Sequence, residues 1–262
     1  MTDGDPFAAG VAPWTAGLGR LRDVVRQHVV TQQLAEVTSG RAPTGTRVLD
    51  VGCGQGTQAV ALARAGFEVT GLDPSMELLD RFRAGIAAEP ADVRARVRWV
   101  HGTGEQLPDA APGPFGLILC HGVLMYLTDP GTVLGPLTTV AAPGALLSLL
   151  VRNGYAPAMR AGLQGDGAGA LAAFDSPHYT NRLGLPARAH TPEDLDAVLE
   201  PLGWRRRRWF GVRVFSDHRN EAAPPPGELE PLLAAEVEAG RRDPYRAVAA
   251  LAHLTYAYDT GR

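Results

Sequence analysis

A glycine-rich loop between an apolar run and a helical pattern constrains the fold more than any other feature of the sequence. It reads DVGCGQG over residues 50–56, and it follows a short apolar run that begins at Arg47. Glycine permits positive φ and lets the backbone approach a ligand without a Cβ in the way. The helix that follows the loop also begins with free N–H groups. The stretch therefore predicts a strand that passes into a helix through a ligand-binding turn.

Strands and helices alternate over the first 152 residues, as in a doubly wound sheet of parallel strands. The predicted strands are residues 47–51, 67–73, 96–102, 115–123 and 145–151. The predicted helices are 18–37, 57–65 and 74–88, and residues 129–144 predict a helix followed by a turn. Later segments predict helices over 191–204, 229–240 and 243–251, and strands over 205–215 and 252–259. We therefore expect an α/β fold with a doubly wound, seven-stranded, mostly parallel sheet.

The chain divides into an N-terminal helical cap, residues 1–45, and a larger domain, residues 46–262. Within that domain, residues 154–190 are rich in Gly and Ala and show weak periodicity, which is typical of a mobile insertion. This insertion follows the fifth strand and could serve as a lid or a dimer contact. Regular structure resumes at Thr191, a good N-cap, with Pro192 at the first helical position.

Composition excludes several classes of protein. A chain of 262 residues can bury a full core, and no apolar run approaches the roughly 20 residues that a membrane span needs. The N-terminus has no basic region followed by an apolar stretch, so we expect a cytoplasmic protein with no membrane partner. The two cysteines, Cys53 and Cys120, suggest neither a disulfide framework nor a metal site. A net charge of -3 neither supports nor excludes RNA binding, and the oligomeric state stays open.

The spacing of the loop glycines indicates which class of ligand the loop binds. A dinucleotide fingerprint needs glycine at relative positions 1, 3 and 6, but here they fall at 1, 3 and 5, with Thr57 at the sixth. An acid also precedes the first glycine by two residues. This pattern resembles motif I of class I S-adenosylmethionine-dependent methyltransferases, which have a Rossmann-like fold. The resemblance implies S-adenosylmethionine as cofactor, its methionine end held by Asp50, Gly52, Cys53 and Gly54.

Three further positions fit a nucleoside ligand. Asp73 ends the second strand, where a carboxylate can accept hydrogen bonds from both ribose hydroxyls, although a nicotinamide enzyme would also place an acid there. The stretch HGTGEQLP, residues 101–108, resembles the family's adenine-side loop and implies contacts by Gly104 and Glu105, although Thr103 stands where many members have Asp. His121 ends the fourth strand and is predicted to border the methionyl group; a buried, hydrogen-bonded histidine is the alternative.

Short blocks between residues 18 and 255 are similar to the tRNA 5-carboxymethoxyuridine methyltransferases, which esterify a carboxylate of a modified wobble uridine. The blocks include LGRLRDVVRQHVVTQQLAEV, LILCHGVLMYLTDP, LSLLVRNG, GVRVFSD and RRDPYRAVAALAHLT. The resemblance assigns the cofactor's carboxylate to Arg22. The chain departs from that family because the segment before Thr191 is only weakly basic. The four arginines at 205–208 alternate faces on a predicted strand, which suits a charged sheet edge.

We predict O-methylation of a carboxylate on a tRNA wobble uridine, with a small-molecule O- or N-methyltransferase of secondary metabolism as the alternative. A third reading, a cofactor-binding protein without activity, is less consistent with the intact motifs. A carboxylate is ionised at neutral pH and needs no general base, but it needs a cation, for which Arg213 and Arg152 are the candidates. An amine or phenol acceptor would need a base, and Tyr126, His121 and Asp217 are the candidates for it.

Overall fold

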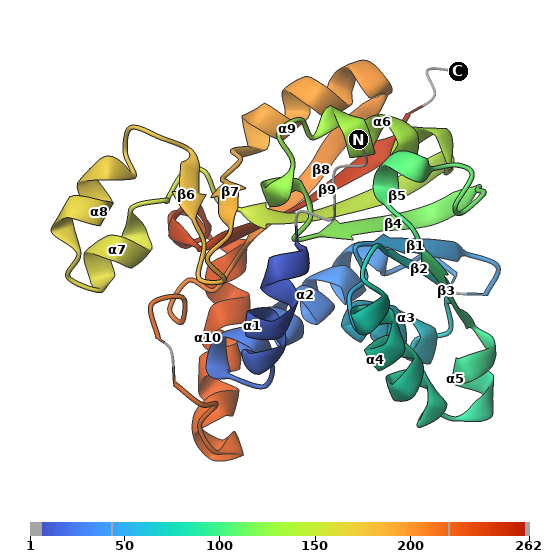
Figure 1. Cartoon of the computed structure of the whole chain (residues 1–262), viewed down its shortest axis with the longest axis horizontal. Coiled ribbons are helices and arrows are strands. Elements are labelled where there is room, and N and C mark those ends of the chain that lie inside the picture. The colour runs from blue at the N-terminus through green and yellow to red at the C-terminus, as the bar shows by residue number, and fades with distance from the viewer. Residues whose placement is uncertain (1–6, 43, 220, 260–262) are drawn as a thin grey trace.

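The structure, a computed structural model, describes residues 7–42, 44–219 and 221–259 and contains a central sheet of seven strands (Figure 1). The strands are β1 (Arg47–Val51), β2 (Glu68–Asp73), β3 (Val97–His101), β4 (Phe115–His121), β5 (Ala141–Arg152), β8 (Trp204–Val212) and β9 (Leu251–Tyr258). Their order is β3-β2-β1-β4-β5-β9-β8. The first five strands are parallel, and β9 runs antiparallel between β5 and β8. The predicted doubly wound, mostly parallel sheet is confirmed.

Helices cover both faces of the sheet (Figure 1). One face packs against α2 (Leu21–Thr38), α3 (Thr57–Arg64), α4 (Met76–Ala87), α5 (Ala91–Ala95) and α10 (Pro226–Arg241). The other face packs against α6 (Gly131–Thr139) and α9 (Pro192–Leu199). Alternate residues of β4 feed the two cores, because Leu117 and Leu119 join the first and Ile118 and Cys120 the second. Both faces are therefore buried, as the nearly continuous apolar strands predict.

The N-terminal segment forms η1 (Ala8–Gly10) and α1 (Val11–Ala16) before α2 begins at Leu21. Leu21, Val25 and Val29 are fully buried on one side of α2, which packs against α10 and the sheet. Short 3-10 turns follow β3, β4 and α9, namely η2 (Gly104–Gln106), η3 (Leu124–Tyr126) and η4 (Glu200–Leu202). The segment before β1 thus covers the face of the sheet next to the glycine loop.

Residues 154–190 form a lobe beside the sheet, at the left of Figure 1, with more regular structure than the sequence predicts. The lobe contains α7 (Met159–Leu163), α8 (Gly167–Ala172) and a separate two-stranded sheet of β6 (His178–Thr180) and β7 (Pro186–Arg188). Elements of three to six residues are too short to show hydrophobic periodicity. Local hydrogen bonds stabilise them, for example from Gly169 N to Asp166 Oδ1 at 2.8 Å.

Two predicted elements near the C-terminus need comment. The helix predicted over 243–251 is wrong: only η5 (Tyr245–Val248) forms, because the chain must re-enter the sheet at Leu251. The arginine-rich strand β8 lies at the edge of the sheet, where Arg206 pairs with Asp196 at 3.0 Å. In the described part of the chain, no helix is both long and apolar enough to cross a membrane.

Candidate active site

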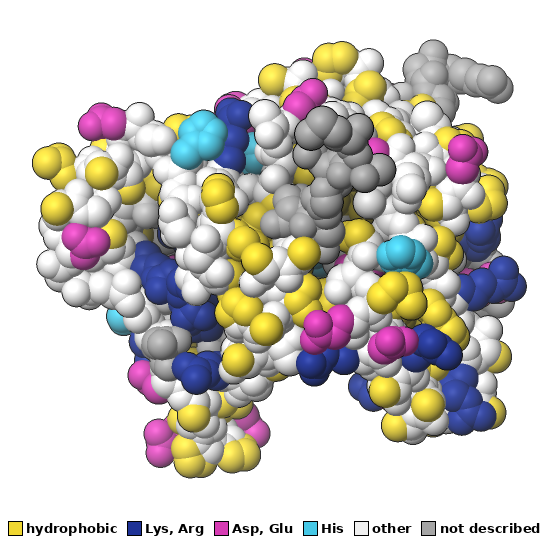
Figure 2. Space-filling view, in the orientation of Figure 1, with side chains coloured by type: hydrophobic (Ala, Val, Ile, Leu, Met, Phe, Trp, Pro, Cys, Tyr) yellow, Lys and Arg dark blue, Asp and Glu magenta, His cyan; other side chains and the backbone are white. Residues whose placement is uncertain are grey.

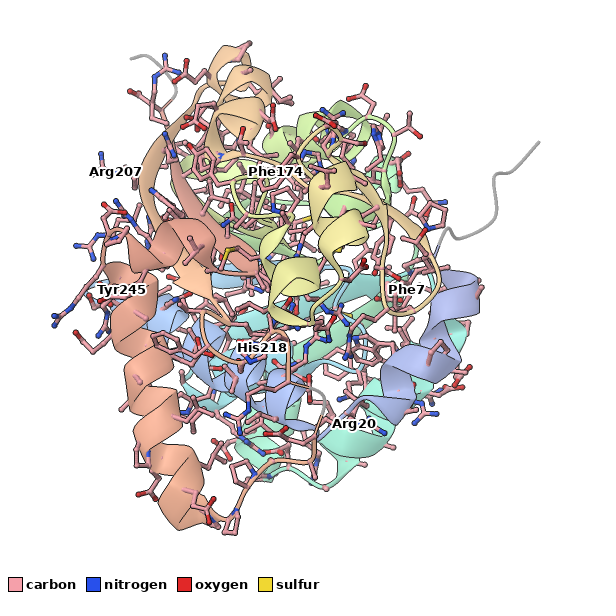
Figure 3. All side chains as sticks on the ribbon, turned by 90° about the vertical axis from the view of Figure 1, so that its left-hand side faces the viewer. Phe7, Arg20, Phe174, Arg207, His218 and Tyr245 are labelled. Atoms are coloured by element: carbon pink, nitrogen blue, oxygen red, sulfur yellow. The ribbon has the colours of Figure 1, made fainter. Side chains whose placement is uncertain are left out.

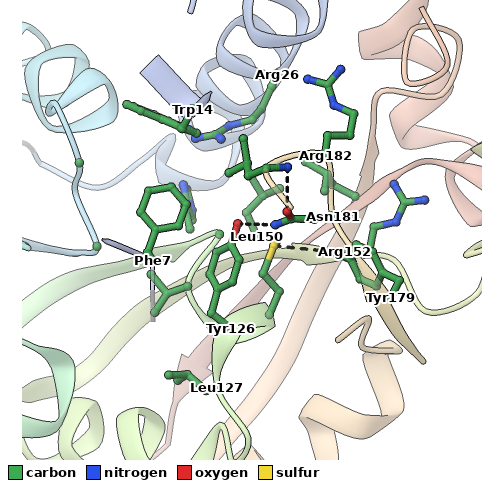
Figure 4. A pocket seen from close by; sticks show the side chains of 18 of the residues that line it. Phe7, Trp14, Arg26, Tyr126, Leu127, Leu150, Arg152, Tyr179, Asn181 and Arg182 are labelled. Carbon is green, nitrogen blue, oxygen red and sulfur yellow. Dashed lines mark hydrogen bonds between the residues drawn. The ribbon is translucent and has the colours of Figure 1, made fainter. Parts of the chain in front are cut away.

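A cavity of about 1100 Å³ opens at the carboxyl ends of β1, β2, β4 and β5 (Figure 4). The N-terminal segment contributes Phe7 and Trp14 to its wall, and the 154–190 lobe closes the opposite side. The cavity is lined by twelve of the residues that the sequence singled out, but not by Asp217; the twelve are Arg22, Asp50, Gly52, Cys53, Gly54, Asp73, Gly104, Glu105, His121, Tyr126, Arg152 and Arg213. Ligands of doubly wound folds bind at this edge of the sheet.

The glycine loop is bare because side chains pack directly against its backbone. Gly52 has φ 69°, and a Cβ there would lie 2.3 Å from Val123 Cγ2. Gly56 has φ 80°, and a Cβ there would lie 2.1 Å from the Phe82 ring. Both positions combine a left-handed backbone with no room for a side chain, which only glycine satisfies.

Asp73 ties the loop to the next helix. Its carboxylate accepts hydrogen bonds from Gly54 N at 2.7 Å and from Ser75 N at 2.8 Å. Ser75 in turn caps α4 by accepting from Leu78 N at 3.3 Å. The Asp73 side chain is buried at the cavity wall, where it organises the backbone of the glycine loop.

The next loop forms a second wall at the carboxyl end of β3. Thr103 N donates a hydrogen bond to Gln106 Oε1 at 2.8 Å, which folds η2. Gly104 is buried in this turn, whereas Glu105 is exposed at the rim of the cavity. This is the loop that the resemblance assigns to the adenine.

Asp50 and Arg26 both line the cavity beside the glycine loop, and the sequence analysis identified only Asp50. Burial and the nearby Asp73 raise the pKa of Asp50 to about 7, while Arg26 opposes that shift. Arg26 lies one turn after Arg22 on α2, and both line the cavity. The sequence did contain a signal for Arg26, because Arg22 and Arg26 are spaced i, i+4 on a helix face that is otherwise apolar. Burial and the carboxylates of Asp50 and Asp73 raise the pKa of the Cys53 thiol.

His121 is part of a buried chain of hydrogen bonds. Its Nε2 lies 2.8 Å from Ser148 Oγ, which lies 2.8 Å from His253 Nε2. His253 Nδ1 then lies 2.8 Å from Gln33 Oε1. Burial and the neighbouring His253 lower the pKa of His121 well below its ordinary value, so the ring is neutral. His121 is thus buried and hydrogen-bonded through Nε2, but it also lines the cavity, and its Nδ1 has no hydrogen-bond partner among the described residues. That His121 borders the methionyl group stays a prediction.

Three arginines from distant elements converge on Asp217. Arg22 Nη2 lies 2.8 Å from Asp217 Oδ1, Arg152 Nη1 lies 3.2 Å from Oδ2, and Arg213 Nη2 lies 3.4 Å from Oδ1. Burial alone would raise the pKa of Asp217, but the arginines outweigh it and hold the pKa below its usual range. Asp217 is therefore an ionised counter-ion, and its lowered pKa argues against the hypothesis that it acts as a general base.

The cluster keeps unused hydrogen-bond donors. Arg22 Nε and Nη1 and Arg213 Nε are buried and have no hydrogen-bond partner among the described residues. Arg213 also has φ 62°, which is rare for a residue with a side chain. Strained backbone of this kind is concentrated at functional sites, where the surrounding structure maintains it.

Glu236 of α10 fixes the loop that carries Arg213 and Asp217. Its fully buried carboxylate accepts hydrogen bonds from Val214 N at 2.7 Å, Phe215 N at 3.1 Å and Ser216 Oγ at 2.6 Å. The sequence analysis missed Glu236, because an acidic residue within a helical pattern is expected to be exposed to solvent.

Comparison with known proteins identifies the family. Residues 48–144 match the family described as a methyltransferase domain. The tRNA 5-carboxymethoxyuridine methyltransferase of Escherichia coli K12 is 31% identical over 237 residues, which cover 90% of this chain and 89% of that protein. The chain belongs to the class I S-adenosylmethionine-dependent methyltransferases.

Other relatives of this methyltransferase differ in their acceptors. The ubiquinone biosynthesis O-methyltransferase of Xanthomonas campestris is 32% identical over 206 residues, which cover 79% of each chain. Among solved structures, magnesium protoporphyrin IX methyltransferase from Synechocystis PCC 6803 has a TM-score of 0.65 and 16% identity, over 96% of this chain and 95% of that one. This last likeness supports the fold alone.

The cofactor of the methyltransferase is S-adenosylmethionine, and the cavity residues suit it. A Cβ at Gly54 would meet only ordinary contacts, the nearest at 3.7 Å from Trp14, so this side of the loop is open to a ligand. The unpartnered buried donors of Arg22 suit a carboxylate, and the carboxylate of Asp50 suits an ammonium. We propose that these residues hold the methionine end, while Asp73 holds the ribose.

Replacing Asp73 with alanine is expected to weaken binding of S-adenosylhomocysteine by about 1.5 to 3 kcal/mol, the range for hydrogen bonds to a charged group. Titration calorimetry measures the change. Asp73→Asn is the control, because it keeps an oxygen that can accept a hydrogen bond from Gly54 N or Ser75 N. If folded Asp73→Ala bound the product as tightly as the wild type, the carboxylate would only organise the loop.

Tyr126 lines the methyltransferase's cavity beside the 154–190 lobe. Its hydroxyl accepts a hydrogen bond from Asn181 Nδ2 at 3.0 Å (dashed in Figure 4), and its ring lies 5.3 Å from that of Phe7. Burial and the nearby Tyr179 raise the pKa of Tyr126 to about 12, so the phenol stays protonated at neutral pH. Tyr179 itself lies 5.8 Å from the Arg152 guanidinium. This side of the cavity thus combines flat aromatic rings with positive charge.

Proposed function

We propose that this methyltransferase forms a methyl ester on a carboxylate, and that the carboxylate belongs to a modified uridine of tRNA. Three core arginines carry the proposal: Arg22, Arg152 and Arg213 line the cavity and converge on one buried aspartate, Asp217. A desolvated site with more arginines than acids favours an anion, and a guanidinium fork matches a carboxylate in two parallel hydrogen bonds.

The proposed step needs positioning but no proton transfer. S-adenosylmethionine supplies a methyl group bound to a positively charged sulfur. A lone pair of the acceptor's carboxylate oxygen forms the new O–C bond as the C–S bond breaks, and the C–S electron pair stays on sulfur. The products are the methyl ester and S-adenosylhomocysteine. Arg213 and Arg152 would hold the carboxylate in line with the methyl group, which is where the enzyme contributes most.

A phenol acceptor, as a ubiquinone O-methyltransferase name suggests for those relatives, would need a base. The three bases considered from the sequence do not suit that role. Burial raises the pKa of the Tyr126 phenol to about 12, and the arginines hold the pKa of Asp217 too low for it to take up a proton readily. Burial lowers the pKa of His121 well below its ordinary value, so this ring also binds a proton weakly, although its Nδ1 has no hydrogen-bond partner among the described residues. Asp50, whose pKa is about 7, lies beside the glycine loop at the cofactor's end. These environments favour an acceptor that is already ionised.

Two observations favour a nucleic-acid acceptor over a small acid. The E. coli relative, whose name specifies a tRNA carboxymethoxyuridine, covers 90% of this chain. The aromatic rings of Phe7, Tyr126 and Tyr179 line the cavity, and unpaired bases of RNA are recognised by stacking on such rings.

The deciding experiment measures S-adenosylhomocysteine release with total tRNA and with a panel of small carboxylic acids. We expect turnover with tRNA that contains 5-carboxymethoxyuridine, and a modified nucleoside 14 Da heavier that mild alkali converts back to the acid. Turnover confined to the small-acid panel would assign the enzyme to small-molecule metabolism. A product stable to alkali would exclude the ester.

At saturating cofactor, kcat is expected to stay nearly constant between about pH 6 and 8, because a carboxylate with a pKa near 4 and arginines are ionised throughout. Saturation is necessary because Asp50, with its pKa raised to about 7, gains negative charge over this range and should strengthen cofactor binding. Initial rates in constant-ionic-strength buffers test this. A tenfold rise per pH unit would indicate a base-dependent acceptor such as an amine.

A further inference from the structure

The buried hydrogen bonds that end at His121 begin at Gln33 of α2 and pass through His253 of β9 and Ser148 of β5. These four side chains are here called the histidine relay. Gln33, Ser148 and His253 are fully buried, and the rings of His121 and His253 lie 5.5 Å apart. Histidine side chains at the molecular surface (cyan in Figure 2) can hydrogen-bond to water. The groups of the relay depend instead on the protein or on a bound ligand.

The direction of every hydrogen bond in the histidine relay follows from Gln33. Its Nε2 donates to the backbone carbonyl of Gly211 at 3.0 Å, a group that can only accept, so Oε1 is the atom that faces His253. An amide oxygen only accepts, and therefore His253 Nδ1 carries a proton. Burial lowers the pKa of His253 to about 3, so the ring is neutral and its Nε2 holds a lone pair.

The same reasoning continues through Ser148 to the cavity. The Ser148 hydroxyl donates its one proton to His253 Nε2 at 2.8 Å, so its oxygen accepts from His121 Nε2, also at 2.8 Å. The His121 ring is neutral too, and a proton on Nε2 leaves Nδ1 with a bare lone pair. This Nδ1 is buried and has no partner among the described residues. An unpaired buried acceptor is unfavourable until a ligand donates a hydrogen bond to it.

The register of the sheet places His121 beside the glycine loop. Val51 of β1 pairs with Cys120 of β4. The next residues along these parallel strands, Gly52 and His121, therefore reach the same carboxyl edge, and both line the cavity. The loop was assigned above to the methionine end of the cofactor. An ammonium group has three N–H donors, so it can donate to Asp50 and still donate to a second acceptor.

We propose that Gln33 sets the tautomer of His121 from the far end of the histidine relay, and that His121 Nδ1 accepts a hydrogen bond from the ammonium group of S-adenosylmethionine. Gln33, Ser148 and His253 are then positioning residues, because only His121 touches the ligand. The tautomer depends on the protein alone, and the contact depends on where the methionine end lies. Neither depends on which acceptor is methylated, so the proposal stands or falls separately from the proposed function.

The test reverses the relay at its far end. A lysine ammonium can only donate, so in Gln33→Lys the Nδ1 of His253 should accept, every later hydrogen bond should reverse, and the proton of His121 should move to Nδ1. Nuclear magnetic resonance of enzyme with isotopically labelled histidine distinguishes the tautomers. The free wild type should show His121 protonated at Nε2, and Gln33→Lys at Nδ1. His218, on the loop after β8 and outside the relay (Figure 3), is the internal reference and should not change.

Cofactor binding provides the second readout. Gln33→Lys should bind S-adenosylhomocysteine at least tenfold more weakly in calorimetry, because an N–H of His121 would then face the ammonium. Methylthioadenosine lacks the amino-acid end and should bind the wild type and the variant with similar affinity. Val29→Ala is the matched control, because it removes packing from the same helix without touching the relay. It should leave the tautomers and the ratio of the two ligand affinities unchanged.

A double variant shows whether the effect passes through the relay. Ser148→Ala interrupts it, so in that background Gln33→Lys should change neither the His121 tautomer nor the affinity for S-adenosylhomocysteine. If Gln33→Lys does not fold, Gln33→Met takes its place: it removes the oxygen that fixes His253, and His121 should become a mixture of tautomers. A wild-type His121 protonated at Nδ1, a tautomer that no Gln33 variant changes, or equal losses with and without Ser148 would overturn the relay. Equal losses for both ligands would overturn the ammonium contact.

Discussion

Replacing Arg213 with alanine is expected to lower kcat/KM for the carboxylate acceptor by between about 30-fold and about 5,000-fold, which corresponds to a loss of about 2 to 5 kcal/mol. The Arg213 side chain is 14% exposed, lies 3.4 Å from Asp217, and keeps a buried Nε without a hydrogen-bond partner among the described residues. In Arg213→Ala, an acceptor carboxylate at this desolvated position would lose a charge-assisted hydrogen bond. One of the positive charges that balance the carboxylate would also be missing.

Two further variants separate the side chain from the backbone. Arg213→Gly removes the same side chain at a position whose φ of 62° suits glycine, so it should lose as much activity with less strain. Arg213→Lys keeps the charge but not the planar fork and should be intermediate. The affinity for S-adenosylhomocysteine should remain within about threefold in all of them. A large loss of cofactor affinity with unchanged kcat would place Arg213 at the cofactor and not at the acceptor.

The parallel half of the fold was predictable because its signals are local. Each of the first five strands is a short apolar run, and the glycine loop and Asp73 mark the carboxyl ends of β1 and β2. The capping of α9 is equally local: Thr191 Oγ1 accepts from Asp194 N at 3.1 Å. Such features depend on residues within a few positions of one another, so the sequence alone indicates them.

The electrostatic arrangement of the site was not predictable, because it depends on contacts between distant residues. Arg22 and Asp217 are separated by 195 positions, yet lie 2.8 Å apart. Arg22, Arg152 and Arg213 were each identified from the sequence, but their shared counter-ion was taken for a possible base. Only the packing of α2 and β5 against the loop after β8 shows that Asp217 must be ionised.

The lobe was difficult for a different reason. Its helices are shorter than two turns and its strands shorter than four residues, and Gly and Ala make up most of α8, so no periodic pattern develops. Arg160 and Arg182 therefore look like ordinary surface arginines in the sequence. Only the position of the lobe in the folded chain shows that both side chains line the cavity.

Replacing Asp217 with alanine is expected to lower the free energy of unfolding at pH 7 by about 3 to 5 kcal/mol, because removing one partner leaves buried charges uncompensated. Arg22, Arg152 and Arg213 would then repel one another in a place where Arg22 and Arg152 are 9% exposed or less. Urea titration followed by circular dichroism gives this free energy. Asp217→Asn keeps the size and removes only the charge, so the difference between the two variants isolates the packing contribution.

The pH dependence distinguishes a charge effect from a packing effect. The arginines hold the pKa of Asp217 below its unfolded value near 4, so its ionised form stabilises the fold above about pH 4, and that contribution is lost as the pH falls below it. The stability gap between wild type and Asp217→Asn should therefore be constant from about pH 5 to 7 and narrow in stronger acid. Added sulfate should stabilise Asp217→Asn more than the wild type, since an anion can replace the missing carboxylate among the arginines. If the stability gap between wild type and Asp217→Asn depended on neither pH nor sulfate, Asp217 would stabilise the loop through hydrogen bonds alone. The arginines would then not require a compensating anion, and the argument for an anionic acceptor would fail.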